Sequence, residues 1–292
     1  MIPSLSLGVL TRHCCSVRVA ISIPHVVTTP TYRWKADGSD LELRLIPVEG
    51  TGAQSYLFGR NSNRKPIEVK SFFISATPVT QALWLHVMGN NPAKYTGLQC
   101  PVENVSWDHI NEQGGFLDRI NSGEILASVA GVQNQMRFRL PSETEWEYAA
   151  RGGPHWKDGF IYSGSNEPDE VAWYGPRWTK THELLGWDMV RRLRLFNKGP
   201  TRIHDVATKA PNQLGIYDMS GNVWEWCEDV CADDLALVPD DGTPFLGQGD
   251  ERRLRGGCHH NWNLHCTVSW RYGIAPDAHD GCIGFRLVLA SA

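Results

Sequence analysis

Residues 41–46 show the clearest regular pattern in the chain, because leucine alternates there with charged side chains. A period of two predicts a β-strand with one buried face. A second strand is predicted over residues 65–74, where Pro66 falls near the beginning and its missing N–H is tolerated. A third, short strand is predicted over residues 137–140.

Three helices are predicted from their capping residues. The first covers residues 81–88 and ends at Gly89. The last begins after Ser142, whose hydroxyl can accept from the backbone three residues on while Glu145 reaches back, which is a capping box. This helix runs to residue 150 and ends at Gly152.

The middle helix is predicted to begin after Ser106, a good N-cap residue. Ile110, Leu117 and Ile120 share one face by their spacing. The glycines at 114–115 weaken its centre. A single helix over this whole stretch is therefore expected, with its weakest point at the glycine pair.

The remaining segments have weaker patterns. Residues 153–213 form a long stretch rich in Gly, Pro and Trp, and a loop of this length is typically functional. Residues 214–219 return to a strand or a turn. We expect residues 1–40 to be an N-terminal extension or an extra strand, and residues 41–292 to form one domain.

Composition narrows the functional class. With 292 residues, 41% hydrophobic and 21% charged, the chain is typical of a folded globular protein. A net charge of −4 gives no basic footprint for nucleic acid. We expect no membrane span, because no apolar run is long enough, and residues 1–27 carry no clear signal peptide. The eight cysteines lack a CxxC pair and are interpreted as free thiols.

Residues 258–282, here called the insert, follow neither helical nor strand periodicity. They hold four of the 11 His and two of the 12 Trp residues of the chain. Trp262, Trp270 and Tyr272 offer large apolar surfaces with a polar tip, which is typical of binding surfaces. The alternative is that the two tryptophans belong to the core. Gly273 and Gly281 give the loops freedom.

Several short motifs follow one another along roughly residues 41–289. They are Ile46-Pro47, Val79-Thr80-Gln81, Pro101 to Trp107, Arg139 to Gly153, Gly215 to Trp226, Leu254 to Gly257 and Ile283 to Arg286. Together they resemble the formylglycine-generating enzyme (sulfatase-modifying factor) family. The resemblance implies an α+β, C-type-lectin-like fold, with a small twisted antiparallel sheet, two or three helices and much irregular chain.

The enzymes of this family carry two cysteines five residues apart. The second falls on Cys266, but the first falls on Asn261, and Cys258 is at the wrong spacing. A copper–thiolate site needs both sulfurs. No copper is therefore expected, and catalysis is not the preferred function.

The end of the chain is similar to another branch, the variable proteins of diversity-generating retroelements. The branch implies a fixed frame, matched here by Cys266, Arg271, Pro276-Asp277 and the Ile283–Arg286 motif, around positions diversified at template adenines. Asn codons diversified in this way never give Lys, Glu, Gln or Met, and none of these occurs in the insert.

We therefore predict a non-enzymatic ligand-binding, or display, protein whose partner is an unknown protein or surface ligand. A cell surface and a phage particle are both open as its location. The alternatives are an oxidase acting on a peptide cysteine and an inactive structural paralogue. The predicted ligand-binding residues are His259, His260, Asn261, Trp262, Asn263, Leu264, His265, Trp270, Tyr272, Gly273, Ile274, Ala275, Ala278, His279 and Asp280.

Two further predictions concern the residues on either side of the insert, here called the frame. By resemblance, the turn at Asn222, Val223 and Glu225 is a candidate site for a structural Ca²⁺, since it offers oxygen ligands. The alternative is a purely structural turn with Trp224 and Trp226 in the core. Arg255 and Arg286 are expected to pair with buried carboxylates, for which Glu145, Glu147 and Glu225 are the candidates, unless they are plain surface charges.

Overall fold

The computed structural model describes residues 32–35, 41–129, 136–175, 184 and 202–291. Its first sheet has five antiparallel strands in the order β1-β2-β5-β11-β6. Strand β11, near the C-terminal end of the sequence, lies between β5 and β6. The C-terminal segment therefore occupies an interior position of the sheet. The bounds are β1 (Tyr32–Lys35), β2 (Glu42–Val48), β5 (Phe72–Ser75), β6 (Met136–Arg139) and β11 (Val288–Ser291).

A second sheet of four strands has the order β10-β7-β8-β9. It is mixed, because β10 runs parallel to β7 while the other pairs are antiparallel. Its strands are β7 (Trp224–Val230), β8 (Arg252–Arg255), β9 (Tyr272–Ile274) and β10 (Ile283–Gly284), and a separate hairpin is formed by β3 (Tyr56–Arg60) and β4 (Asn63–Ile67).

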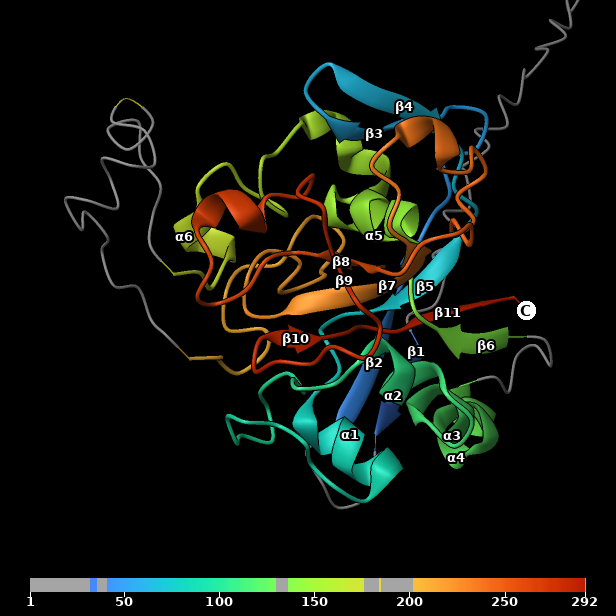
Figure 1. Cartoon of the computed structure of the whole chain (residues 1–292), viewed down its shortest axis with the longest axis vertical. Coiled ribbons are helices and arrows are strands. Elements are labelled where there is room, and N and C mark those ends of the chain that lie inside the picture. The colour runs from blue at the N-terminus through green and yellow to red at the C-terminus, as the bar shows by residue number, and fades with distance from the viewer. Residues whose placement is uncertain (1–31, 36–40, 130–135, 176–183, 185–201, 292) are drawn as a thin grey trace, which may run out of the picture.

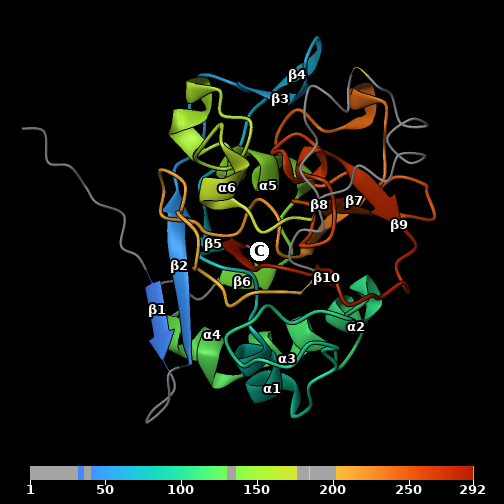
Figure 2. The same cartoon turned by 90° about the vertical axis from the view of Figure 1, so that its left-hand side faces the viewer.

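Short helices cover both sides of the sheets. Helices α1 to α4 lie together on one side, whereas α5, α6 and the β3–β4 hairpin lie on the other (Figures 1 and 2). None of the helices in the described residues is long and apolar enough to cross a membrane. The α-helices are α1 (Gln81–Met88), α2 (Trp107–Asn111), α3 (Phe116–Ser122), α4 (Glu124–Val129), α5 (Glu143–Ala150) and α6 (Pro168–Val171), and the 3-10 helices are η1 (Gly153–Asp158), η2 (Leu235–Leu237) and η3 (Asn263–Cys266).

The predicted helix end at Gly89 and the predicted capping box at Ser142 are confirmed. The Leu83 backbone N–H donates to the Thr80 hydroxyl at 3.2 Å, and Gly89 ends α1 in the left-handed conformation. At α5, the Glu145 N–H donates to the Ser142 hydroxyl at 3.1 Å, and the Glu145 carboxylate accepts from the Ser142 N–H at 2.9 Å. These local bonds satisfy N–H groups that a helix start leaves free.

Two predicted elements are each divided in the structure. Residues 65–74 form β4 and β5 instead of one strand, because the Glu68 N–H donates away from the sheet, to the carbonyl of Asp240 at 2.7 Å. The single helix expected after Ser106 is α2 and α3, because Gly114 has φ +76 and breaks the helix. Ser106 itself caps α2 as predicted.

Three other segments can be compared with their predictions. Residues 214–219 form a turn and irregular chain, which is one of the two predicted alternatives. Within residues 1–40, the described residues Tyr32–Lys35 form an extra strand paired with β2, and the rest lie outside the described residues. The segment 153–213 is irregular apart from η1 and α6 where it is described.

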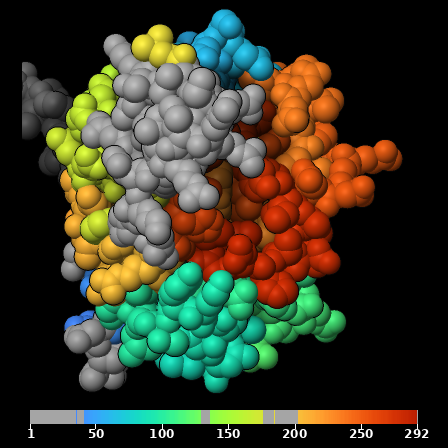
Figure 3. Space-filling model, turned by 60° about the vertical axis from the view of Figure 1, so that its left-hand side comes forward, coloured from blue at the N-terminus to red at the C-terminus, as the bar shows by residue number. Residues whose placement is uncertain are grey.

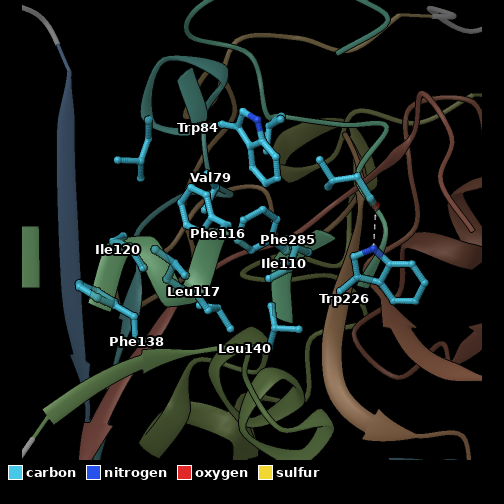
Figure 4. Packing of buried hydrophobic residues seen from close by; sticks show 14 of the residues in the cluster. Val79, Trp84, Ile110, Phe116, Leu117, Ile120, Phe138, Leu140, Trp226 and Phe285 are labelled. Atoms are coloured by element: carbon cyan, nitrogen blue, oxygen red, sulfur yellow. Dashed lines mark hydrogen bonds between the residues drawn. The ribbon is translucent and has the colours of Figure 1, made fainter. Parts of the chain in front are cut away.

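One core lies between the sheets and helices α1 to α4 (Figure 4). Its centre is aromatic: the Trp84 and Phe116 rings stack with centroids 5.2 Å apart, and Phe285 meets Phe116 edge to face at 5.1 Å. Trp226 belongs to the same core, and its indole N–H donates to the carbonyl of Val105 at 3.0 Å. A second core packs around α5 and includes Trp146.

Buried ion pairs join the elements, as predicted for the two arginines. Arg286 and Glu225 are both fully buried, and two guanidinium nitrogens donate to the two carboxylate oxygens at 2.6 and 2.7 Å. Arg255 pairs with the buried Glu147 through one contact, from Nη2 to Oε2 at 2.5 Å. The remaining candidate, Glu145, pairs with Arg139 instead, at 2.6 Å.

Replacing Arg286 by alanine is expected to lower the free energy of unfolding by about 3–5 kcal/mol, because the Glu225 carboxylate then stays buried without its counter-charge. Denaturant unfolding measures this loss. Arg137→Ala is the matched control: Arg137 is exposed, so its loss is expected to change stability by no more than about 0.5 kcal/mol. Equal losses in the two variants would contradict the pairing.

Candidate functional site

The insert is fastened to the frame at several buried points. Cys258 and Cys266 are fully buried, and Cys282 is nearly so. Between them, the Arg271 guanidinium donates twice to the carboxylate of Glu143 on α5, both times at 2.7 Å. The insert is therefore an ordered segment with fixed ends and a fixed middle.

Arg255, which precedes the insert on β8, holds the insert backbone by further hydrogen bonds. Besides binding Glu147, its guanidinium donates to the backbone carbonyls of Val268, at 2.8 Å, and of Trp270. Strand β9 then pairs with β8, with Tyr272 opposite Leu254. Frame and insert thus share a sheet, and the insert side chains project from a rigid backbone.

The insert lines a cavity of about 370 Å³. Eight of the predicted ligand-binding residues contribute to its wall. Four further side chains that were not predicted also contribute, three from outside the insert and one from its last residue, Cys282. Figure 3 shows the C-terminal residues, in red, at the surface of a hollowed face. The predicted lining residues are His260, Asn261, His265, Trp270, Tyr272, Ile274, His279 and Asp280, and the additional ones are Trp224, Leu254, Cys282 and Ile283.

The cavity combines aromatic surface with groups that form hydrogen bonds. Tyr272 is 49% exposed, and its ring lies 5.5 Å from that of Trp224. His265 meets Trp270 edge to face at 4.5 Å. Burial lowers the pKa of His265, which favours its neutral form. Such a wall can hold a ligand by apolar contact and by hydrogen bonds together.

Several other predicted residues are exposed or half-buried. Ala275 is exposed, and Trp262, Leu264, Gly273 and Ala278 are half-buried. Trp270 is also half-buried and packs partly against the core, so it serves both the cavity and the core that was its alternative.

Two predicted ligand-binding residues are wrong, because their side chains are turned inward. His259 is 1% exposed, and its Nδ1 lies 3.1 Å from the carbonyl oxygen of Asn222. Burial lowers the pKa of His259 to about 4. Asn263 is 6% exposed and donates to the Tyr162 hydroxyl at 3.0 Å. A residue list taken from a contiguous segment cannot separate the two sides of an irregular loop.

The sequence did not identify the frame side chains in the cavity, since an apolar or aromatic residue next to a strand predicts only burial. Trp224 shows why: it is 6% exposed and belongs to the main core, yet it also lines the cavity. One signal was available in the sequence: Ile283 directly follows the insert. In the structure Ile283 is the register partner of Trp224, which brings both residues to the cavity.

The Cys266 thiol lies apart from this cavity. It packs with Tyr162, Val171 and Tyr174, and its sulfur contacts the carbonyl of Trp262 at 3.8 Å. Burial raises the pKa of Cys266, which keeps the thiol protonated at neutral pH.

The turn at 222–225 uses its side chains for structure. The Asn222 amide exchanges hydrogen bonds with the backbone of His204, at 3.0 and 3.1 Å. Both Glu225 oxygens accept from Arg286, and one also accepts from the Trp146 indole at 2.6 Å. The guanidinium repels a cation there, so the structure contradicts these two side chains as calcium ligands. Calcium binding as such stays a prediction.

Comparison with known proteins supports the same frame. A family model of the sulfatase-modifying factor enzyme 1-like domain matches residues 46–291. The chaperone protein LppX of Paenibacillus barcinonensis is 36% identical over 212 residues, 63% of this chain and 70% of that protein. The formylglycine-generating enzyme of Streptomyces coelicolor is 34% identical over 215 residues, 70% of this chain but 59% of that enzyme.

Among solved structures, Treponema denticola variable protein 1 superposes with a TM-score of 0.66 and 27% identity. The match covers 89% of this chain and 99% of that one. The predicted α+β fold is thereby confirmed.

Side chains of the insert and of the frame should differ in their effect on stability. Tyr272→Ala is expected to lower the free energy of unfolding by less than about 1 kcal/mol, since the ring is half exposed. Phe285→Ala should cost about 3–5 kcal/mol, because the ring is fully buried. Denaturant melts compare the two variants. A loss for Tyr272→Ala as large as that for Phe285→Ala would show that the insert is part of the core.

Proposed function

Because the chain belongs to the family of the sulfatase-modifying factor enzyme 1-like domain, we propose that it is a non-enzymatic member that binds a ligand through the insert. The ligand is a protein or another surface molecule, and the cavity of the insert is the contact site. The observation that carries this proposal is the convergence of eight predicted side chains on one cavity.

The chemistry of the cavity supports recognition. Tyr272 and Trp270 give rigid apolar contact area, which costs little side-chain entropy on binding. His260, Asn261 and His279 add donors and acceptors that suit different partners. The backbone underneath is held by Arg255 and Arg271, so side chains can change without loss of the frame.

Oxidation of a peptide cysteine finds less support in the same residues. Asn261 occupies the place of one of the two family cysteines, and an amide cannot replace a thiolate toward copper. The other cysteine position, Cys266, is a buried thiol that packs with Tyr162, Val171 and Tyr174. The pair that the reaction needs is thus incomplete.

Diversification of the insert by a retroelement is the second part of the proposal. It is supported by the structural likeness to Treponema denticola variable protein 1. The arrangement also suits it: the matched residues Cys266 and Arg271 make buried contacts, whereas Tyr272, His279 and Asp280, which follow them in the chain, are exposed.

A library randomised at Asn261, His265, Tyr272, Ile274 and His279 should remain folded and should yield binders. We expect display on yeast, with selection against a probe protein such as streptavidin, to enrich variants with micromolar affinity or better. Alanine at a selected position should weaken their binding by about tenfold, which is about 1.4 kcal/mol.

The matched control is a library of the same size at five core positions: Val79, Phe116, Ile120, Leu140 and Phe285. Its members should fail to fold, because large-to-small and polar substitutions in a core are costly. Equal misfolding of both libraries, or an absence of binders from a folded cavity library, would contradict the proposal.

A further inference from the structure

A cluster of sulfur and imidazole groups lies at one wall of the cavity. The ligand atoms offered by Cys258, His259 and His260 all lie within 4.8 Å of one another. The Cys258 sulfur is 3.6 Å from Nδ1 of His260. Three donor groups at this separation can reach a common ion after small side-chain movements.

A second thiol touches the same cluster. The Cys282 side chain interacts with both Cys258 and His260. It also lines the cavity, together with His260, whereas Cys258 and His259 are buried beneath it. Cys258 and Cys282 are the first and the last residue of the insert, so the cluster lies where the insert leaves the frame and returns.

The surroundings of His259 suit a ligand role. Its Nδ1 lies 3.1 Å from the backbone carbonyl of Asn222. A carbonyl only accepts, so Nδ1 carries the proton and Nε2 keeps its lone pair. Histidines that bind metals commonly donate their other N–H to a carbonyl in this way, which fixes the ring.

The donor set selects the kind of ion. Thiolate and imidazole are the ligands of structural zinc sites, which are four-coordinate. The set contains no carboxylate, and hard ions such as Ca²⁺ and Mg²⁺ prefer oxygen. We propose that Cys258, His259, His260 and Cys282 bind one Zn²⁺ ion, which ties the two ends of the insert together at the wall of the cavity.

The zinc site does not rest on the proposed ligand binding, although His260 and Cys282 also line that cavity. Its four ligands do not include the side chains of the turn at 222–225 or of the family cysteine positions Asn261 and Cys266. The Asn222 carbonyl orients His259, and the Asn261 side-chain oxygen accepts from the Cys258 thiol at 2.9 Å. The ion adds a bond between the start and the end of the insert, which the hydrogen bonds of Arg255 and Arg271 leave unconnected. Zinc is therefore expected to raise the melting temperature of the protein.

The test uses the full chain, reduced and freed of metal, with Zn²⁺ or Co²⁺ alone as the probe. We expect one Zn²⁺ per chain in competition with a chromophoric chelator. With Co²⁺, we expect the absorption bands of a tetrahedral site and a thiolate charge-transfer band. Cys258→Ser and His260→Ala should each weaken Zn²⁺ binding at least about tenfold, since each removes a ligand.

His260 is exposed, so His260→Ala should keep the fold, which circular dichroism verifies. Cys282→Ser should remove the tetrahedral cobalt spectrum. The matched controls are Cys231→Ser and His155→Ala, a half-buried thiol and an exposed imidazole outside the cluster. Both should bind Zn²⁺ like the unchanged protein.

Three results would overturn the zinc site. These are the absence of stoichiometric Zn²⁺ binding by the reduced protein, undiminished affinity in a folded His260→Ala variant, and equal losses in the control variants. Undiminished affinity and an unchanged cobalt spectrum in Cys282→Ser would contradict the place of Cys282 among the four ligands. None of these results bears on whether the cavity binds a protein ligand.

Discussion

The guanidinium of Arg286 holds together segments that are far apart in the chain. It is fully buried, donates to both oxygens of Glu225 on β7, and also donates to the carbonyls of Ser75 and Tyr217 at 3.0 and 2.9 Å. Glu225 in turn accepts from the indole of Trp146 on α5. A buried ion pair stabilises a fold only when its remaining hydrogen-bonding groups are also satisfied, and here the bonds run to both sheets and to a helix.

A second buried arginine connects the frame to the insert. Arg255, the neighbouring buried cation, binds Glu147 and the insert carbonyls at Val268 and Trp270. Arg271, within the insert, donates to both carboxylate oxygens of Glu143 on α5. Charge and backbone thus fix the path of the insert, whereas Tyr272 and His279, which line its cavity, are exposed. Such a division lets one surface change while the fold stays constant.

Local patterns predicted the parts of the fold that local bonds determine. The caps at Ser106 and Ser142 and the stop at Gly89 were predicted correctly, because each is made within one turn of chain. The predicted helix after Ser106 failed at Gly114, where the cost of glycine was recognised but the break was not. The pairing of Arg286 with a buried carboxylate was predicted, but the choice of Glu225 among three candidates depends on tertiary packing.

The candidate site was predicted as a segment and not as a surface. The unusual composition of the insert drew attention to it, and eight of its residues meet at one cavity. The inward direction of His259 and Asn263 could not be predicted, because an irregular loop has no period that assigns sides. The contact of Cys282 with Cys258 and His260 was equally hidden, since it joins residues from opposite ends of the insert.

The central claim is that residues 258–282 form a diversified binding surface on a constant frame. Sequencing the DNA around the gene tests it most directly. A diversified surface predicts a near-copy of the segment that encodes residues 258–282, differing from it at adenines and lying beside a reverse transcriptase gene. A complete neighbourhood without such a copy would contradict diversification by a retroelement.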